Sequence, residues 1–460
     1  MARAQAPTKH MVYLPMVSVP APRNPFGFDL SIYSSGDVLK YGLETQPRWA
    51  RAGDVLWPKV EPVRGAGYDW SSLVYVESNI RRLRAAGIEP TLIIQQSPSW
   101  AQQVGGRLCS PPKPEVLDDF ANYVYALVKR YSSGDLQVNY WEFWNEPDAR
   151  PQDTLDEHGI GCWADPSKAD YGGSYYGQVL QRISPMIKAA NPNAKVIAGA
   201  LIYGLVSDTS DKPHISELFL DGMLASGAGK SFDALSFHAY GEYGANSMLV
   251  AKAIRVRAQL AKYQLSDKPI YSTELAAMCA GWVEAECTPT YNDWLYTQAN
   301  YAARIYAEAL ALKLDGAFWY SLSGTNPGFR FSHLIDDTNG RLVPRPAYYA
   351  FMNSSHLLSG AEYIGPPLTE LAPDQLEKVQ MLKFKKPTST LYVLWVPRID
   401  SARPDTIYRI PVLRGAKAYC VQTLNKADSW KTPYECTDTN SDGLINIAVN
   451  SNPFYVEVPN

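Results

Sequence analysis

The sequence predicts an α/β protein, with a (β/α)8 TIM barrel followed by a C-terminal all-β sandwich. From about residue 25 to 357, short apolar runs alternate with segments that have helical periodicity. The apolar runs are nearly continuous, as expected for parallel strands that are buried on both faces. From residue 358 to 460 the helical pattern disappears and strand-like runs separated by turn residues remain. Residues 1–24 are rich in proline and are expected to be a tail or linker.

Eight strand candidates account for the barrel. They cover residues 25–32, 48–55, 91–94, a run from Leu136 that Pro147 stops, 195–201, 232–239, 269–276 and 316–323. Helices with an apolar face lie between them, around residues 73–83, 120–131 and 293–314, and residues 57–62 are predicted to be a loop. Eight such units predict a closed barrel, and a doubly wound parallel sheet is the alternative fold.

The C-terminal region contains six strand candidates without a helix between them. They cover residues 379–384, 391–396, 406–412, 418–423, 444–449 and 454–458. Short strands separated by turn residues are typical of a sandwich of about 100 residues.

Composition excludes several classes of partner. The formal net charge of −3 argues against binding to nucleic acid or to an anionic membrane surface. No apolar run approaches the ~18 residues that a membrane-spanning helix needs. We therefore expect neither a nucleic-acid partner nor a membrane partner.

The six cysteines predict an oxidising compartment. Their number is even and no Cys-x-x-Cys occurs, so we expect the disulfides Cys279–Cys287, Cys420–Cys436 and Cys109–Cys162, and a secreted protein. The alternative is six buried thiols. Residues 2–6 resemble an Ala-x-Ala cleavage site, although no apolar stretch precedes them.

Two carboxylates are predicted at the same mouth of the barrel. Glu146 follows the fourth strand and Glu274 ends the seventh. The carboxyl ends of all strands in such a barrel meet at one face, which is where chemistry is placed. A pair of carboxylates there suits glycoside hydrolysis, in which one group donates a proton and the other attacks the anomeric carbon.

The same residues resemble the clan A glycoside hydrolases, which are retaining enzymes on (β/α)8 barrels. Asn145-Glu146 after strand four and Glu274 after strand seven carry the resemblance, which spans about residues 25–355. It implies that Glu146 is the acid/base and Glu274 the nucleophile. The segments 97–101 and 141–147, together with 334–336, Gly340 and 346–349, look closest to family 39.

The resemblance also implies a set of supporting residues. Arg51 resembles the arginine of strand two that supports the nucleophile. His238-Ala239-Tyr240 matches the His-x-Tyr of family 5 and its relatives at strand six, and Trp319 matches the tryptophan of strand eight that forms the floor of the sugar site. Asn145 is expected to donate a hydrogen bond to a sugar 2-hydroxyl, and Tyr240 to hold Glu274 ionised. The structural alternatives are an ion pair for Arg51 and a core position for His238 or Trp319.

The resulting expectation is a retaining glycosidase that acts on a carbohydrate and needs no cofactor or metal. No His-Glu-x-x-His occurs, and the EF-hand-like segment 438–443 has Val449 where the bidentate glutamate should be. A transglycosidase with the same residues and a non-catalytic carbohydrate-binding barrel remain alternatives. The sugar, the linkage and the oligomeric state are left open.

Overall fold

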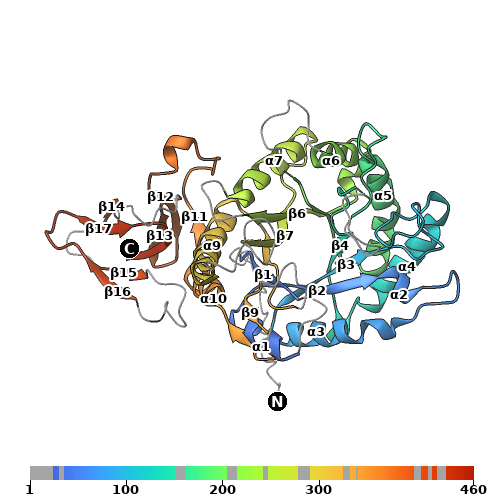
Figure 1. Ribbon diagram of the computed structural model, residues 1–460, viewed down its shortest axis with the longest axis horizontal. Coiled ribbons are helices and arrows are strands. Elements are labelled where there is room, and N and C mark those ends of the chain that lie inside the picture. The colour runs from blue at the N-terminus through green and yellow to red at the C-terminus, as the bar shows by residue number, and fades with distance from the viewer. Residues whose placement is uncertain are drawn as a thin grey trace, which may run out of the picture.

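The computed structural model describes residues 24–30, 36–150, 161–204, 215–241, 247–277, 291–324, 332–337, 340–397, 406–412, 417–421, 431 and 433–460. Eight parallel strands pair in sequence order, and β1 also pairs with β8, which closes a barrel (Figure 1). Antiparallel sheets follow it in the chain. The predicted fold class, a (β/α)8 barrel with a C-terminal β region, is confirmed.

The barrel strands lie close to the predicted positions. They are β1 (Phe26–Asp29), β2 (Trp49–Leu56), β3 (Glu89–Gln95), β4 (Tyr140–Phe143), β5 (Lys195–Leu201), β6 (Ala234–Gly241), β7 (Ile270–Ala277) and β8 (Gly316–Trp319). The helices around them are α1 (Gly36–Glu44), α3 (Val74–Ala85), α4 (Leu117–Arg130), α5 (Gly173–Ala190), α6 (Ile215–Ala225), α7 (Met248–Lys262), α9 (Tyr291–Ala311) and α10 (Pro346–Leu358). No helix in the described part of the chain is long and apolar enough to span a membrane.

Two local predictions are wrong. The fourth strand does not begin at Leu136, which ends the short 3-10 helix Gly134–Leu136, and it ends at Phe143, well before Pro147. Trp144 has a φ of +70°, so the backbone leaves the extended conformation there. The segment predicted as a loop after β2 forms the short helix α2 (Trp57–Val60), in which proline occupies an early position where its missing N–H is tolerated.

Aromatic side chains fill the amino-terminal end of the barrel. Trp49, Tyr271 and Phe318 are buried there, and the Trp49 ring makes an edge contact with Tyr271 at 5.5 Å between centroids. A Cβ on Gly27 would lie 2.6 Å from the Phe318 ring, so glycine at this position makes room for the aromatic residues. This layer leaves the opposite end of the barrel interior for polar side chains.

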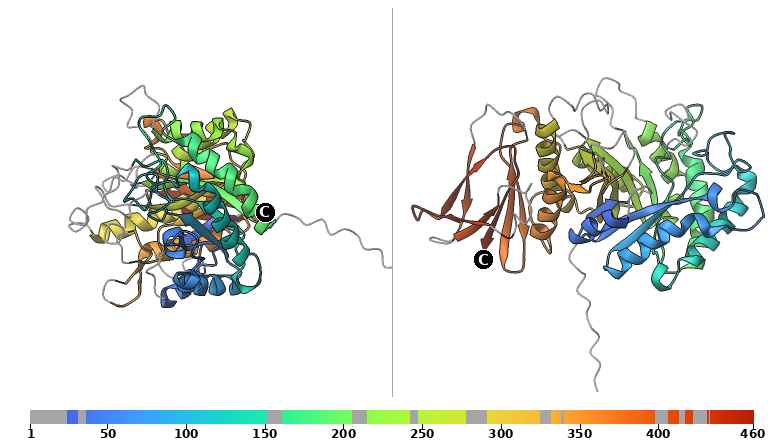
Figure 2. Two further views of the ribbon diagram at one scale, coloured as in Figure 1. Left: turned by 90° about the vertical axis from the view of Figure 1, so that its right-hand side faces the viewer. Right: turned by 60° about the horizontal axis from the view of Figure 1, so that its bottom comes forward.

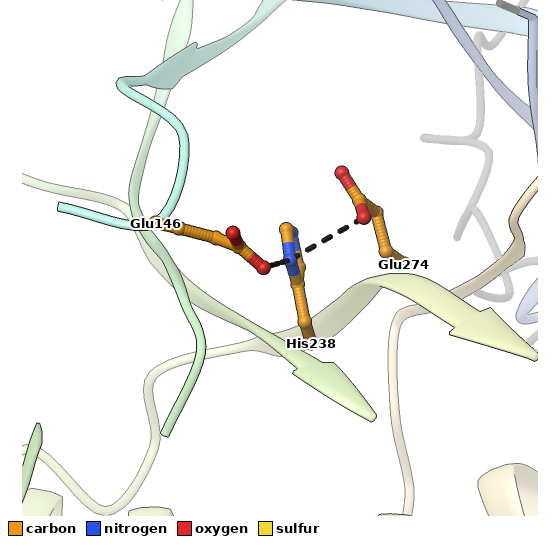
Figure 3. Close-up of side chains that lie close together, drawn as sticks. All are labelled: Glu146, His238 and Glu274. Atoms are coloured by element: carbon orange, nitrogen blue, oxygen red, sulfur yellow. Dashed lines mark hydrogen bonds and ion pairs between the residues drawn. The ribbon is translucent and has the colours of Figure 1, made fainter. Parts of the chain in front are cut away.

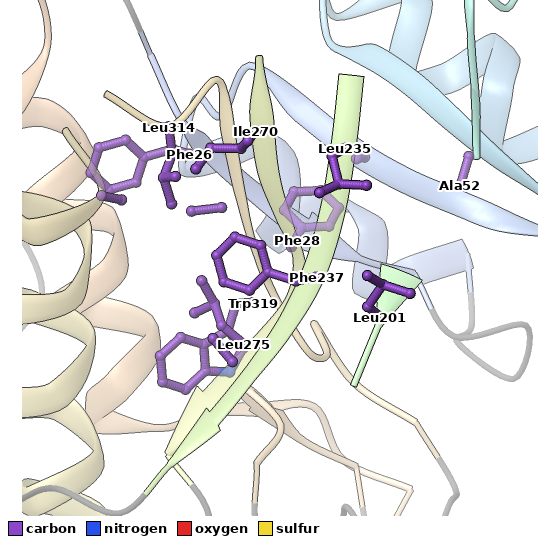
Figure 4. Close-up of a cluster of buried hydrophobic side chains, with 14 of the residues drawn as sticks. Phe26, Phe28, Ala52, Leu201, Leu235, Phe237, Ile270, Leu275, Leu314 and Trp319 are labelled. Carbon is purple, nitrogen blue, oxygen red and sulfur yellow. The ribbon is translucent and has the colours of Figure 1, made fainter. Parts of the chain in front are cut away.

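Apolar side chains on the outer face of the strands pack against the surrounding helices. Figure 4 shows part of this core, with Phe237, Leu275 and Trp319 together near β6 and β7. Leu235 and Leu201 belong to the same buried cluster. The barrel strands are therefore fixed from both sides.

The C-terminal region forms two antiparallel sheets. The larger has the order β11 (Glu362–Tyr363), β12 (Gln380–Lys385), β13 (Ser389–Trp395), β18 (Phe454–Pro459), β15 (Lys417–Val421), β16 (Tyr434–Thr437), and the smaller pairs β14 (Thr406–Pro411) with β17 (Leu444–Val449). Leu394, Ile410, Ile447 and Val456 share a core between the two sheets. Strands β11 and β16 escaped the sequence prediction because β11 has two residues and three of the four β16 residues are exposed.

The other face of the larger sheet packs on the barrel. Figure 2 shows this sheet beside α9 and α10. Leu391, Val393 and Tyr455 belong to the same buried cluster as the barrel residues. The Tyr455 hydroxyl donates a 2.6 Å hydrogen bond to the carbonyl of Ala303 in α9 and lies 3.3 Å from the hydroxyl of Ser354 in α10. The sheet is therefore sandwiched between the two helices and the smaller sheet.

Two of the three predicted disulfides are confirmed. Cys109 pairs with Cys162 and Cys420 with Cys436, with Cα atoms 5.4 and 6.0 Å apart. Cys279 and Cys287 lie outside the described residues.

The contact between the sheet and the helices should contribute strongly to stability. Tyr455→Ala removes a fully buried ring and should lower the free energy of unfolding by about 3–5 kcal/mol, whereas Tyr455→Phe, which removes only the hydroxyl, should cost about 1 kcal/mol. Thermal and denaturant unfolding measure both. Tyr419→Ala is the matched control, because Tyr419 on the same sheet is 45% exposed. Equal stability of Tyr455→Ala and Tyr419→Ala would contradict the packing described here.

Candidate active site

Arg51 is the central cation of the barrel interior. Its side chain is 2% exposed. It donates hydrogen bonds to Glu142 on β4 at 3.0 Å and to the Oδ1 of Asn145 at 3.0 Å, and it forms an ion pair with Glu274 on β7. Burial of a guanidinium requires such partners. Glu142 and Glu274 supply them, and the carboxyl group of Asp29 on β1 is a third partner at 3.5 Å. Arg51 thus connects β2, β4 and β7 at one height of the barrel.

Glu142 is held on three sides. Its Oε2 accepts from Arg51, and its Oε1 accepts from the hydroxyl groups of Ser236 at 2.6 Å and Thr273 at 2.7 Å. The side chain is fully buried. It therefore acts as a fixed counter-ion for Arg51, without contact with solvent.

Glu274 receives donors on both carboxylate oxygens. Arg51 contacts Oε1, and the Tyr240 hydroxyl donates to Oε2. The Nδ1 of His238 lies 3.4 Å from the same Oε2. Hydrogen bonds and an adjacent cation stabilise the charged form of a carboxylate. The Glu274 side chain is 7% exposed. Glu274 lies within β7 and not at its end, because the strand continues to Ala277.

Glu146 sits on a strained backbone after β4. Its φ is +48°, its N–H donates to the carbonyl of Ala200 at 2.9 Å, and it faces Glu274 across His238 (Figure 3). Non-glycine residues with such a φ are uncommon and are often found where a structure must aim a side chain. The conformation directs the Glu146 carboxyl into the mouth of the barrel.

A neighbouring segment holds the Glu146 loop in place. The N–H of Gly161 donates to the Asn145 carbonyl at 3.1 Å, and the N–H of Trp163 donates to the Pro147 carbonyl at 3.2 Å. A Cβ on Gly161 would lie 1.8 Å from the Glu146 carbonyl oxygen, so no larger residue fits. The adjacent Cys162 forms the disulfide to Cys109, which anchors this segment to the loop after β3.

The environment of Glu146 favours its protonated form. Burial, and then the negative charge of Asp148, raise its pKa to about 8, while Arg51 and Lys252 act in the opposite direction. Its Oε1 lies 2.8 Å from the Nδ1 of His238. Burial lowers the pKa of His238 to about 4, so near neutral pH a neutral imidazole and a neutral carboxyl group share this hydrogen bond.

Lys252 and Asp148 are two buried charged residues that act electrostatically on Glu146. The ammonium group of Lys252, on α7, donates to the carbonyl oxygens of Ile202 at 2.7 Å and His238 at 2.8 Å, and burial lowers its pKa to about 8. The carboxylate of Asp148 accepts from the N–H groups of Ile202 and Tyr203 at 2.9 and 3.0 Å. Lys252 and Asp148 carry opposite charges, and they therefore shift the pKa of Glu146 in opposite directions.

Glu146, His238 and Glu274 also have the spacing of a metal site. One donor atom from each lies within 4.8 Å of the other two. However, Arg51 and Tyr240 already donate to the oxygens of Glu274, and Arg51 adds a positive charge beside them. This donor set fits proton transfer better than a divalent cation.

Trp319 does not form the floor of the site. Its side chain is fully buried, its Nε1 donates to the Ser332 carbonyl at 2.7 Å, and its ring contacts Tyr301 of α9. Successive side chains of a strand point to opposite faces. The next residue, Tyr320, is partly exposed, and its ring lies 6.0 Å from that of Tyr240. This corrects the expectation: Trp319 lies outside the cluster, and the aromatic residue beside Tyr240 is Tyr320, which directly follows β8.

The structure brings together six of the seven residues predicted for the site. They are Arg51, Asn145, Glu146, His238, Tyr240 and Glu274. Sequence reasoning missed Glu142, Asp148, Lys252 and Tyr320. A signal existed for Glu142, which is a carboxylate in the middle of an apolar strand. Lys252 gave none, because a lysine in a helix is ordinarily exposed.

Similarity to known proteins is detectable only in structure. No protein-family model matches the sequence, and no curated protein matches it. A family 39 glycoside hydrolase from Bacteroides cellulosilyticus WH2 aligns with a TM-score of 0.68 and 19% identity, over 95% of this chain and 81% of that one. A family 30 endoxylanase from Clostridium papyrosolvens C71 aligns with a TM-score of 0.64 and 12% identity, over 96% and 98%.

A monomeric beta-xylosidase from Caulobacter crescentus CB15 aligns with a TM-score of 0.57 and 15% identity, over 96% of this chain and 98% of that one. At these identities the comparisons establish a shared fold. The resemblance to family 39 that the sequence motifs indicate is confirmed as a similarity of fold.

Substitution of the two buried charges should move the pKa of Glu146 in opposite directions. Lys252→Met removes a cation and should raise the pKa, and Asp148→Asn removes an anion and should lower it, each by about one pH unit. Carbon-13 NMR of protein labelled at glutamate Cδ, with the signal assigned through Glu146→Gln, measures this.

Lys262→Met provides the control for this titration. Lys262 lies on the same helix but is exposed and paired with Asp221, so its loss should leave the Glu146 titration unchanged. Shifts in the same direction for Lys252→Met and Asp148→Asn would show that the two charges do not act on Glu146 as described.

Proposed function

We propose that this protein is a retaining glycoside hydrolase that cleaves β-type glycosidic bonds of oligo- or polysaccharides by double displacement. The observation that carries the proposal is the opposed pair Glu146 and Glu274, which lie in different environments at one mouth of the barrel. Glu146 is buried beside a negative charge and keeps its proton, whereas Glu274 receives hydrogen bonds on both oxygens. Carboxyl groups whose environments differ in this way take different roles.

In the first step Glu274 attacks the anomeric carbon and Glu146 donates a proton. A carboxylate oxygen of Glu274 forms a bond to the anomeric carbon, the bond from that carbon to the leaving oxygen breaks, and Glu146 transfers its proton to the leaving oxygen. One oxygen of Glu146 and one oxygen of Glu274 lie within 4.8 Å of each other. This approach supports direct attack, which uses carboxyl groups about 5–5.5 Å apart, rather than the separation of about 6.5–9.5 Å that admits a water.

In the second step Glu146 acts as a base. Its carboxylate takes a proton from water while the water oxygen attacks the anomeric carbon, and the ester bond to Glu274 breaks. Asn145 has its amide oxygen occupied by Arg51, which orients the NH2 group to donate to a sugar hydroxyl. Neutral His238 keeps the Glu146 carboxyl oriented through their shared hydrogen bond.

The remaining features fit an exported enzyme with an accessory region. All catalytic groups named here come from residues 25–357, and we infer that residues 358–460 stabilise the barrel and add no catalytic group. Two disulfides support secretion into an oxidising compartment. Since two of the similar structures are an endoxylanase and a beta-xylosidase, aryl β-xylosides and xylan are the first substrates to test.

The two carboxyl groups should respond differently to removal. Glu274→Ala should abolish turnover, and added azide should restore part of it and give a glycosyl azide of inverted configuration. Glu146→Ala should lose about 10²–10⁴-fold on substrates with poor leaving groups and little on activated aryl glycosides, which need no proton. Azide should rescue this variant with net retention.

Rates on aryl β-glycosides with leaving groups of graded pKa, together with product analysis, measure these effects. The control is Glu115→Ala, because Glu115 is exposed and lies outside the cluster. Identical responses of the two active-site variants to leaving group and azide would refute the assigned roles. If the glycosyl group is transferred to an added acceptor sugar and never to water, the protein is a transglycosidase. If the substrate binds and is not turned over, the protein is a carbohydrate-binding barrel.

A further inference from the structure

A short segment, residues 161–164, runs along the loop that follows β4 and is called the clamp segment below. Its backbone N–H groups donate to the carbonyl oxygens of Asn145 and Pro147, and the N–H of Ala164 donates to the carbonyl of Ala149 at 3.2 Å. Every second residue of the loop, from 145 to 149, is thus hydrogen-bonded to the clamp segment.

Side chains strengthen this pairing. The Nε1 of Trp144 donates to the Gly161 carbonyl at 3.1 Å, and the Trp144 ring makes an edge contact with Trp163 at 4.8 Å between centroids. Cys162 lies between these two contacts and forms the disulfide to Cys109, and both cysteines are 2% exposed. One hydrogen bond, one aromatic contact and one covalent bond therefore hold the clamp segment in place.

The loop needs such contacts because its backbone is strained. Trp144 and Glu146 have φ angles of +70° and +48°, and Cys162 in the clamp segment has a φ of +58°. Non-glycine residues keep such angles only where the surrounding structure enforces them. The position of the Glu146 carboxyl group should therefore change when contacts of the clamp segment are removed.

We propose that the clamp segment positions Glu146 for proton transfer, and that Trp144 and the Cys109–Cys162 disulfide are the positioning residues through which it acts. A proton donor must lie within hydrogen-bond reach of the leaving oxygen, and a displacement of about 1 Å can reduce the rate about 100-fold. Trp144 and both cysteines are buried, so they act through Glu146. The role of Glu146 as the acid rests on the proposed function, whereas the position of its carboxyl group can be tested without turnover.

Trp144→Phe tests the proposal, because it keeps a buried ring and removes the indole N–H. The Glu146 carboxyl group should move toward solvent at the mouth of the barrel, and its pKa, which burial raises to about 8, should fall by about one unit. Carbon-13 NMR of protein labelled at glutamate Cδ measures this without a substrate. Trp141→Phe is the matched control, because Trp141 is a buried tryptophan of β4 that packs against Tyr131, and it should leave the titration unchanged.

Removal of the disulfide should have the same effect. The double variant Cys109→Ala/Cys162→Ala should lower the pKa of Glu146, because the clamp segment loses its covalent anchor. The double variant Cys420→Ala/Cys436→Ala removes the disulfide of the C-terminal sheet and should lower stability alone.

Turnover separates positioning from a general loss of structure. Trp144→Phe should lose about tenfold in rate on aryl β-glycosides with poor leaving groups and little on activated ones, which need no proton. A wild-type protein that hydrolyses neither would contradict the proposed function and leave the NMR test in force. The positioning proposal is overturned if Glu146 titrates alike in Trp144→Phe and Trp141→Phe, or if Trp144→Phe slows both kinds of substrate equally.

Discussion

The buried charge of Arg51 is the constraint on which the site depends. A guanidinium in the barrel interior must be matched by carboxylates. Glu142 on β4 and Glu274 on β7 provide them, and Asp29 on β1 lies 3.5 Å away. Glu142 is locked by two hydroxyl groups and has no access to solvent, so it can only act as a counter-ion. Glu274 is the partner that faces the mouth of the barrel. The same arginine also orients the amide of Asn145. One side chain thus places two groups that we expect to contact the substrate.

Neighbouring charges and hydrogen bonds give the carboxyl groups of Glu146 and Glu274 different environments. Glu146 is 9% exposed and Glu274 is 7% exposed, so burial alone does not distinguish them. Their neighbours do. Glu274 lies against a cation and a phenolic donor, whereas Glu146 lies between a neutral imidazole and the anion Asp148. The strained backbone of Glu146, held by a neighbouring glycine and a disulfide, keeps its carboxyl in that environment. The two carboxyl groups therefore lie within a few ångströms of each other in different environments, and only that of Glu146 is shown to raise the pKa.

Periodicity and motif order were sufficient to predict the barrel and most of the site. Strand β5 coincides with its prediction because its apolar run is bounded clearly, while β4 is shorter because Trp144 adopts a positive φ that no local residue pattern signals. The aromatic residue of the site was predicted one position too early, at Trp319 and not at Tyr320. The direction of a side chain depends on barrel register and not on residue type. Lys252 was missed because its role arises from the packing of α7 against β6 and from its contact with Ile202, the residue after β5, which the sequence does not reveal.

The most direct test of the account is covalent trapping of the nucleophile. Activated 2-deoxy-2-fluoro-β-glycosides, beginning with the xyloside, should form an ester that is hydrolysed slowly, and peptide mapping by mass spectrometry should locate it. The account predicts one label per chain on the peptide that contains Glu274, no label in Glu274→Ala, and faster loss of the label when an acceptor sugar is added. A label on any other residue, or a turned-over substrate that leaves no adduct and yields a product of inverted configuration, would contradict it.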